Sequence, residues 1–205
     1  MYVKVLTDKQ RELLPLIKIF SPDFYLVGGT AIALHIGHRR SIDFDLFTSE
    51  SIKRKSIKYQ IKKNSYLLDK IIHETSDQIH VVINSVKVTF FSFPFKIETP
   101  VYFRDVIKIP CLLDLAAMKA YALGDRAKWK DYVDLYFILK SYYTVDQISD
   151  RAKNIFEGYF NEKLFRQQLS YFEDINYSES VEFIGKEISE DEIKKFLIDM
   201  ATTPF

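Results

Sequence analysis

The chain has 205 residues, of which 47% are hydrophobic and 28% charged, so it can bury a sizeable core and is not a disordered chain. Its formal net charge of +1 gives no global signal for nucleic-acid binding, so any such contact needs a local basic patch. A single cysteine, Cys111, excludes an internal disulfide and fits a reducing compartment. No apolar run reaches 18 residues and the N-terminus lacks a signal-peptide core, so we expect a cytoplasmic protein without membrane contact.

The first informative feature is a glycine pair that follows a short apolar run. The apolar run predicts a strand that ends at Val27, and Gly28 and Gly29 come next. A helix is predicted over residues 30–36. Glycine lets a ligand approach the backbone closely, and the N–H groups at the start of a helix point toward an anion. This arrangement suits the phosphates of a nucleotide.

A second apolar run carries two carboxylates at alternate positions. In a strand, residues two apart share a face, so we expect Ile42, Phe44 and Leu46 to point into the core. Asp43 and Asp45 would then point the other way, roughly 7 Å apart. Two carboxylates this close favour a cation between them, and Mg²⁺ takes oxygen ligands while leaving room for substrate phosphates.

A basic loop joins the two parts of this motif. Arg39 and Arg40 directly precede the carboxylate run. At least one of them is expected to bind phosphate or to form an ion pair with the carboxylates, and the alternative is a solvated loop charge. Strand, glycine pair, helix, basic loop and Asp-x-Asp strand together predict a site for a metal-bound nucleoside triphosphate.

Residues 51–63 predict a basic helix with a buried stripe of isoleucines. One interpretation is a solvated charged face, and the other is a contact surface for an RNA acceptor, because lysine and arginine clusters supply most phosphate contacts. Residues 70–74 and 78–93 then predict strands, with a hairpin turn at Asn84 and Ser85.

Residues 114–140 predict two helices that separate near Gly124 and Asp125, and the pattern stays helical to residue 205. On the second helix, Asp131 and Asp134 are three residues apart and therefore share a face. A lattice of surface ion pairs, with Lys130 bound to Asp134 and Arg126 bound to neighbours of Lys130, is the alternative to a functional cluster.

The stretch GGTAIALHIGHRRSIDFDLF, residues 28–47, resembles the core motif of the nucleotidyltransferase superfamily. It is similar in particular to the AbiEii/AbiGii-type nucleotidyltransferase toxins, in which a Gly-Gly-Thr helix leads to Arg-x-Ser-x-Asp-x-Asp-Leu-Phe. Those families carry a lysine on a later helix and then Lys/Arg-Asp-x-x-Asp-Leu, which Lys119 and residues 130–135 match here.

This resemblance implies a role for each matched residue. Asp43 and Asp45 would hold Mg²⁺ with a nucleoside triphosphate (NTP), and Asp131 or Asp134 would serve as a further catalytic carboxylate that positions the acceptor hydroxyl. The sequence does not separate these last two. The implied phosphate-binding residues, with Lys119 also counted as catalytic, are Gly28, Gly29, Thr30, Arg39, Arg40, Ser41 and Lys119.

The chain departs from the superfamily at one strand position. Many nucleotidyltransferases carry a third carboxylate beside the first two, and the best-matched residue here is Thr89. A threonine hydroxyl can form hydrogen bonds but cannot supply an anionic metal ligand. Either another acid replaces the missing one, or a single metal suffices, or the protein binds nucleotide without transferring it.

The expected fold is α/β, with a small mixed β-sheet and flanking helices in a nucleotidyltransferase core over residues 1–105. A helical region over residues 106–205 would complete the active-site cleft. The expected function is transfer of a nucleoside monophosphate from Mg-bound NTP to a hydroxyl of an RNA, such as tRNA, or of a protein. By resemblance this would be the toxin of a bacterial toxin–antitoxin or abortive-infection system with a separate antitoxin. The alternatives are a non-catalytic nucleotide-binding regulator and an antitoxin-type interaction module.

Overall fold

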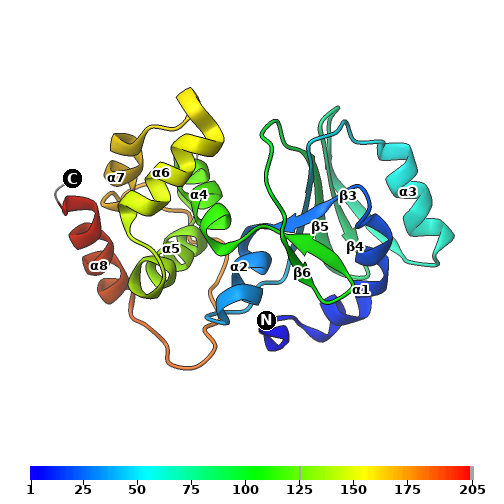
Figure 1. Cartoon of the computed structure of the whole chain (residues 1–205). Helices are drawn as coiled ribbons and strands as arrows, with labels where there is room; N and C mark the ends of the chain where they lie inside the picture. Colours follow the sequence, from blue (N-terminus) through cyan, green and yellow to red (C-terminus); the bar gives the residue numbers. More distant parts are fainter. Residues whose placement is uncertain (125, 204–205) are drawn as a thin grey trace. The chain divides into compact units, whose positions relative to one another are not determined.

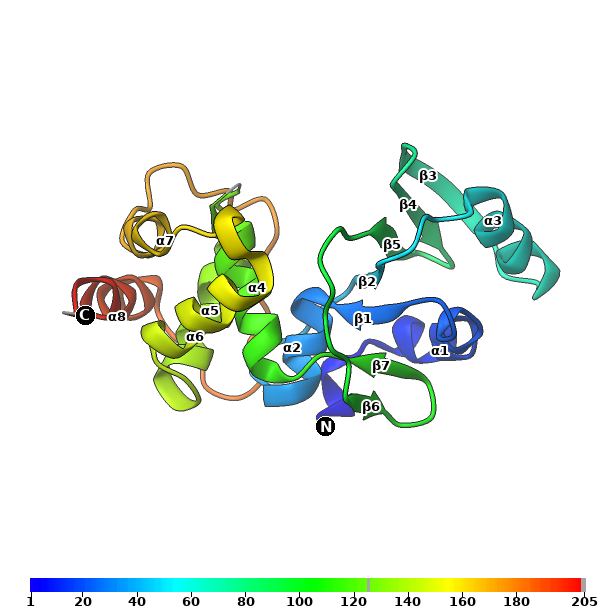
Figure 2. The ribbon, with the colours of Figure 1, turned by 45° about the horizontal axis from the view of Figure 1, so that its top comes forward.

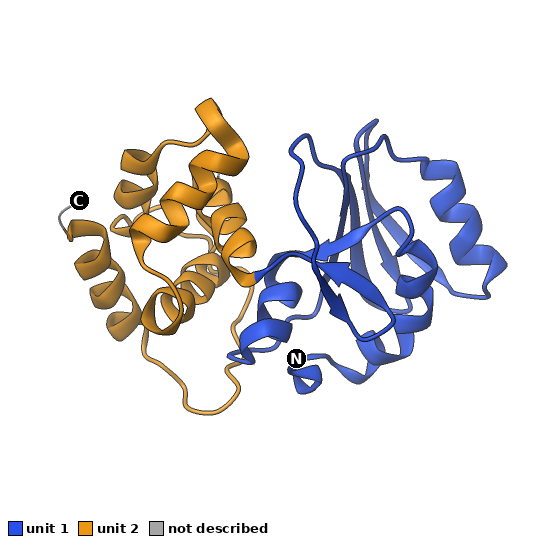
Figure 3. Ribbon diagram, viewed as in Figure 1, with its two compact units in different colours: residues 1–111 blue, residues 112–205 orange. Residues whose placement is uncertain are grey.

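The computed structural model describes residues 1–124 and 126–203 and divides into two compact units. Unit 1 spans residues 1–111 and unit 2 spans residues 112–205 (Figure 3). Unit 1 contains the mixed sheet, and the regular elements described in unit 2 are all helices (Figure 1). The predicted α/β class is therefore confirmed, while the functional division of the chain at residues 105 and 106 stays a prediction.

Unit 1 begins with alternating helices and strands and ends with five consecutive strands. The Thr7 hydroxyl accepts the Gln10 N–H at the start of α1, and the Gln10 side chain accepts the Thr7 N–H, which forms a capping box. The elements of unit 1 are η1 (Val3–Val5), α1 (Asp8–Phe20), β1 (Tyr25–Val27), α2 (Gly28–Ile36), β2 (Phe44–Thr48), α3 (Arg54–Lys63), β3 (Leu68–Glu74), β4 (Gln78–Ile83), β5 (Val86–Ser92), β6 (Val101–Phe103) and β7 (Ile107–Ile109).

Five strands form the main sheet in the order β1-β2-β5-β4-β3. Only the central pair, β2 and β5, is parallel, and the other neighbours are antiparallel. The predicted hairpin joins β4 to β5, and its turn residues Asn84 and Ser85 both have positive φ, at 48° and 67°. Such φ values are those of a type I′ turn, which matches the twist of the two strands.

One face of this sheet is apolar and covered by helices. Phe44, Leu46 and Phe90 on this face are fully buried. Helix α1 packs there, with the Phe20 ring 4.8 Å from the Phe90 ring. Helix α3 lies on the same side, as Figures 1 and 2 show. The opposite face carries Asp45.

The side-chain alternation expected of the carboxylate strand holds for two of its three apolar positions. Phe44 and Leu46 are buried, but Ile42 is 54% exposed, so its predicted place in the core is wrong. The reason is that β2 begins at Phe44. Residues before that point are not in the strand, and their side chains need not follow its two-residue period.

Strands β6 and β7 form a separate two-stranded sheet that sequence periodicity did not predict. Three residues each are too few for a pattern to stand out. Strand β7 lies beside β1 (Figure 2). The His35 ring nitrogen Nε2 lies 3.0 Å from the Pro110 carbonyl oxygen, which fastens the end of α2 to the residue that follows β7.

Unit 2 is a bundle of five α-helices within the described residues. The Tyr121 and Phe156 rings stack 4.2 Å apart between α4 and α6, and the Tyr136 and Phe196 rings meet at 5.1 Å between α5 and α8. The predicted helix separation includes Gly124, which lies in a turn, and Asp125, which lies outside the described residues. The elements of unit 2 are α4 (Leu112–Leu123), α5 (Trp129–Ser141), α6 (Val145–Phe156), η2 (Glu157–Tyr159), α7 (Glu162–Leu169) and α8 (Glu190–Thr202).

Across residues 1–124 and 126–203, no helix has both the length and the apolar character needed to span a lipid bilayer.

Candidate active site

Asp45 is placed beside the start of α2 by the pairing of β1 with β2. Val27, the last residue of β1, lies opposite Asp45, and the chain enters α2 at Gly28. Gly28 has φ of +72°, and a Cβ atom there would collide with the Asp45 carboxylate oxygen Oδ2. Glycine is therefore required at this position both for its backbone conformation and for the space that Asp45 occupies.

We expect Gly28→Ala to destabilise unit 1 and to displace Asp45. A left-handed conformation costs an L-residue about 1–2 kcal/mol, and the clash with Asp45 adds to this cost. Denaturant unfolding measures the loss of stability. Gly158→Ala is the matched control, because Gly158 has no positive φ and a Cβ atom there would have no other atom within 4 Å. A change of less than about 0.5 kcal/mol at Gly28 would contradict this interpretation of the turn.

Asp43 is held through its backbone rather than through a strand. The Thr30 hydroxyl contacts the Asp43 carbonyl oxygen and lies 2.8 Å from the Ser41 hydroxyl oxygen. Because a carbonyl oxygen can only accept, Thr30 donates its hydrogen to Asp43. The Gln10 side-chain amide also donates to this carbonyl oxygen, at 3.4 Å. The first turn of α2 and the start of α1 therefore fix the backbone that presents the Asp43 carboxylate.

Gly29 makes room for the basic loop. A Cβ atom at Gly29 would lie 2.5 Å from Arg39 Nη2 and 3.3 Å from Ser41 Oγ. Arg39 is only 1% exposed, and its Nη1 donates to the Arg40 carbonyl oxygen at 2.9 Å. Arg40 is half-buried, and its Nη1 donates to the Lys4 carbonyl oxygen at 3.3 Å. The Arg39 guanidinium therefore lies against the first turn of α2, where helical N–H groups lack intrahelical acceptors.

The neighbouring strand β5 supplies Thr89 and Lys87 to the same face. Thr89 lies opposite Asp45 in the parallel ladder and is 8% exposed. The ladder begins with Phe44 opposite Val88, and its register, continued one residue back, places Lys87 beside Asp43. The Lys87 ammonium lies 3.8 Å from Asp43 Oδ2. The residue opposite Asp45 on β5 is thus Thr89, which cannot supply an anionic metal ligand.

The described residues contain no group of three or more His, Cys, Asp or Glu side chains suited to hold a metal ion. The donor set at this face is the pair of carboxylates of Asp43 and Asp45. Two carboxylates fit Mg²⁺ when it is bound partly by substrate phosphates, as is usual for this ion. The missing side chain at Gly28 leaves Asp45 accessible from the helix start.

The basic helix α3 lies on the opposite side of the sheet from Asp45. Lys58 of α3 forms an ion pair with Glu74 of β3 at 2.8 Å. Glu74 pairs with Ile79, whose fully buried side chain belongs to the apolar face. The basic helix is therefore not a neighbour of the carboxylate pair, and its interpretation as an RNA contact surface stays a prediction.

In unit 2, Lys119, Asp131 and Asp134 form a buried charged triad. The Lys119 ammonium contacts Asp131 Oδ1 and lies 3.1 Å from Asp134 Oδ2. The side chains of the three residues are 8%, 2% and 0% exposed, respectively. Such burial sets the triad apart from ordinary surface ion pairs, because removing one of its charges would leave the others uncompensated where there is little water. The structure thus brings together the three unit 2 residues that the sequence singled out.

Asp131 differs from Asp134 in what its second oxygen meets. Asp131 Oδ2 is buried and has no hydrogen-bond partner among the described residues, and Arg126 Nε lies 3.4 Å away. Lys130 lies 3.2 Å from Glu179 instead of pairing with Asp134. Of the ion pairs in the surface-lattice alternative, Lys130 with Asp134 is therefore wrong, whereas Arg126 does pair with a neighbour of Lys130, namely Asp131. Both aspartates are buried, so this cluster is not a surface lattice.

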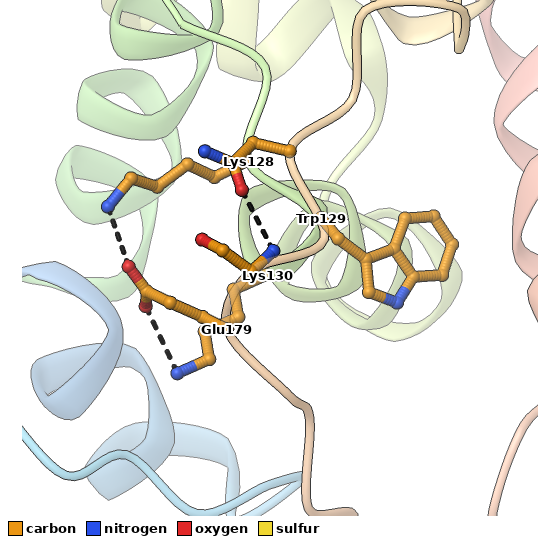
Figure 4. A pocket seen from close by; sticks show the side chains of 6 residues that line it. Lys128, Trp129, Lys130 and Glu179 are labelled. Carbon is orange, nitrogen blue, oxygen red and sulfur yellow. Dashed lines mark hydrogen bonds and ion pairs between the residues drawn. The ribbon is translucent and has the colours of Figure 1, made fainter.

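The start of α5 is covered by an irregular segment, residues 170–188. Backbone hydrogen bonds join Asn176 to Ala127 and Trp129, at 2.7 and 3.2 Å. Glu179 lies 2.8 Å from the Lys128 ammonium and 3.2 Å from that of Lys130 (Figure 4). The residues that make these contacts line a small pocket that has no room for a ligand. The contacts therefore hold the segment against α5 and do not form a binding site.

We expect Glu179→Gln to weaken unit 2 by about 1 kcal/mol at pH 7, a small value because the side chain is partly exposed and screened. Lys128 and Lys130 lower the pKa of Glu179 from 4.5 to about 2. A lowered pKa stabilises the fold above pH 4.5, and this contribution is lost as the pH falls toward 2. The difference between the two proteins in urea unfolding should therefore vanish near pH 2. Glu187→Gln, an exposed position in the same segment, is the control.

Comparison with solved structures identifies the class of fold. The chain is similar to the MenT4 nucleotidyltransferase toxin of Mycobacterium tuberculosis H37Rv, with a TM-score of 0.64, 10% identity, and 95% of this chain and 82% of that chain covered. It is also similar to JHP933 from Helicobacter pylori, with a TM-score of 0.58, 18% identity, and 96% and 91% covered. At these identities the likeness concerns the fold, which is that of nucleotidyltransferase toxins.

The sequence comparisons identify the family. Residues 17–204 match the family described as the nucleotidyl transferase AbiEii toxin of type IV toxin–antitoxin systems, and the chain belongs to this family. An uncharacterised protein of Aquifex aeolicus (strain VF5) is 30% identical over 197 residues, which cover 92% of this chain and 94% of that protein. The family expected from residues 28–47 and 119–135 is confirmed.

Proposed function

We propose that this protein transfers a nucleoside monophosphate from a Mg-bound NTP to a hydroxyl of an RNA, such as a tRNA, or of a protein. The observation that carries the proposal is the carboxylate pair, with Gly28 against Asp45 and Thr30 bonded to the backbone of Asp43. Three consecutive residues at the start of a helix thus support the two acids and the basic loop. A solvated strand face has no need of such support.

Asp43 and Asp45 would hold Mg²⁺ together with the phosphates of the NTP. The bound ion would offset phosphate charge and orient the α-phosphate. The first turn of α2, over Gly28, Gly29 and Thr30, would direct backbone N–H groups at the phosphates, because these groups have no acceptor within the helix.

The proposed reaction forms one bond and breaks one. The acceptor hydroxyl oxygen attacks the α-phosphorus and loses its proton, and the bond from this phosphorus to the oxygen bridging to the β-phosphate breaks. Pyrophosphate leaves with the electron pair of that bond. Lys119, with Arg39 or Arg40, would offset the charge that builds on the leaving group, as positive side chains do in other phosphoryl transfers.

Asp131 is our candidate for the residue that orients the acceptor hydroxyl. Both aspartates are buried and contact Lys119, but the Asp131 Oδ2 oxygen makes no hydrogen bond among the described residues and has only Arg126 Nε nearby, at 3.4 Å. A buried carboxylate oxygen without a donor favours a partner that arrives with the substrate. Asp134 would then position Lys119.

The membership of a type IV toxin family supports a role as the toxin of such a system, with a separately encoded antitoxin as partner. We further propose that the protein uses Mg²⁺, acts on an RNA or protein acceptor and works in the cytoplasm. A non-catalytic nucleotide-binding regulator is the competing function, and Thr89 beside Asp45 is the observation that favours it.

The test uses the four NTPs, each labelled at the α-phosphate and incubated separately with Mg²⁺, the protein, total bacterial RNA and bacterial protein. We expect label from at least one NTP to enter RNA or protein and to be lost with Asp43→Ala/Asp45→Ala. Label in neither fraction, while NTP still raises the unfolding temperature, would replace the transferase with the regulator. Label that persists in the double variant would refute the assigned carboxylates.

A further inference from the structure

The strand that lacks the third carboxylate, with Thr89 at that position, carries a lysine two residues earlier. Lys87 lies two residues before Thr89 on β5, so both side chains are on the face of Asp45. Its ammonium lies 3.8 Å from Asp43 Oδ2. The site therefore presents two carboxylates and one fixed cation, where a polymerase-like site presents three carboxylates.

This substitution changes the charge that a bound metal meets. Three carboxylates carry three negative charges and attract two divalent ions, as in two-metal sites. Asp43, Asp45 and Lys87 together carry a single net negative charge, so they attract a second divalent ion less strongly than three carboxylates would. The positive charge of Lys87 repels a second divalent ion and so weakens its binding beside Asp43.

We propose that Lys87 takes the place of a second metal ion, so that this active site holds one divalent ion with its nucleotide. The inference rests on the proposed nucleotide site at Asp43 and Asp45. Lys87 would act as a positioning residue, because its charge orients the Asp43 carboxylate.

The pair differs from an ordinary surface ion pair in how its two ends are held. Isolated ion pairs between exposed side chains contribute little, because both side chains must be ordered to form them. Here the side chains are 36% and 27% exposed. The antiparallel pairing of β5 with β4 fixes the Lys87 backbone, and the hydrogen bonds from Thr30 and Gln10 fix that of Asp43. Because both backbones are already fixed, forming the ion pair orders only the two side chains.

The test counts Mn²⁺ ions by electron paramagnetic resonance, with no turnover required. The probes are the α,β-methylene analogues of ATP, GTP, CTP and UTP, added separately because their bridging carbon blocks transfer. We expect one bound Mn²⁺ per wild-type chain and two per chain of Lys87→Glu, which adds a third carboxylate to this face. Lys87→Met should still bind one ion, about fivefold more tightly, because the repelling charge is gone.

Lys70→Glu is the matched control. Lys70 pairs with Val82, which in turn pairs with Lys87, so it lies on the same face two strands away. This variant carries the same change of net charge and should bind one ion with wild-type affinity. Thermal unfolding checks that every variant is folded, and Lys87→Met alone decides the matter if Lys87→Glu does not fold.

The possible failures are distinct. Two Mn²⁺ ions per wild-type chain, or one ion with folded Lys87→Glu, would overturn the role of Lys87 and leave the nucleotide site intact. Unchanged Mn²⁺ affinity in Lys87→Met would overturn it as well. No Mn²⁺ on the wild-type protein with any analogue would overturn the proposed nucleotide site and this inference together.

Discussion

Asp45→Asn is expected to lower the initial rate of nucleotide transfer by about 10³-fold or more. Removing one of two carboxylate ligands sacrifices several kcal/mol of charge stabilisation, and each 1.36 kcal/mol corresponds to a tenfold change in rate. The asparagine keeps the shape of the side chain, so the contact with Gly28 and the pairing with Val27 remain. The initial rate is measured with the α-labelled NTP that the protein uses.

Asp23→Asn is the control for this change, because Asp23 is an exposed residue of the same unit that follows α1. Its rate should equal that of the wild-type protein. Equal unfolding temperatures for the three proteins would attribute any loss to chemistry rather than to folding. A folded Asp45→Asn protein with the wild-type rate would exclude Asp45 from the reaction.

Lys119→Met should destabilise the protein more than Gly28→Ala or Glu179→Gln. It leaves the carboxylates of Asp131 and Asp134 buried together without their shared cation. Removing one partner of a buried ion pair typically costs about 3–5 kcal/mol, because the remaining charge is left uncompensated. Denaturant unfolding at pH 7 measures this loss.

Lys163→Met is the control for this loss of stability, because Lys163 lies at an exposed position on α7. It should change the free energy of unfolding by less than about 0.5 kcal/mol. If Lys119→Met lost no stability, the ammonium would not be the counter-ion that its contacts indicate.

A further variant separates charge from packing. In Lys119→Met/Asp131→Asn/Asp134→Leu the triad is replaced by uncharged side chains of similar size, and most of the lost stability should return. This triple variant should remain inactive in nucleotide transfer if the triad serves the reaction.

The sequence predicted the parts of the fold that depend on a local residue pattern, such as a strand with alternating burial or a hairpin turn. Phe44 and Leu46 alternate with Asp45 and are buried, and Asn84 and Ser85 form the expected turn. Ile42 continues the same alternation but is exposed, because the strand starts two residues later. The path of residues 41–43 is set by hydrogen bonds from Thr30 and Gln10, which are tertiary contacts that no local period contains.

The candidate site was predictable in its residues but not in its contacts. The spacing of Asp131 and Asp134 indicated their common face. It could not show that Lys119, a residue type that usually stays in water, is buried between them. Lys87 was visible on the right face of its strand. Its pairing with Asp43 depends on the register between the parallel strands β2 and β5. The sequence of neither strand alone determines how the two align.

The two kinds of ion pair in unit 2 should respond differently to ionic strength. Screening acts over about 8 Å at 0.15 M salt and about 3 Å at 1 M, and it weakens exposed pairs far more than buried ones. Glu179 is about one-third exposed, whereas Asp134 is not exposed at all. Concentrated salt should therefore loosen residues 170–188 first and raise their amide hydrogen exchange, while the amides of α5 around Asp134 keep their protection. The bundle would then open from this outer segment inward.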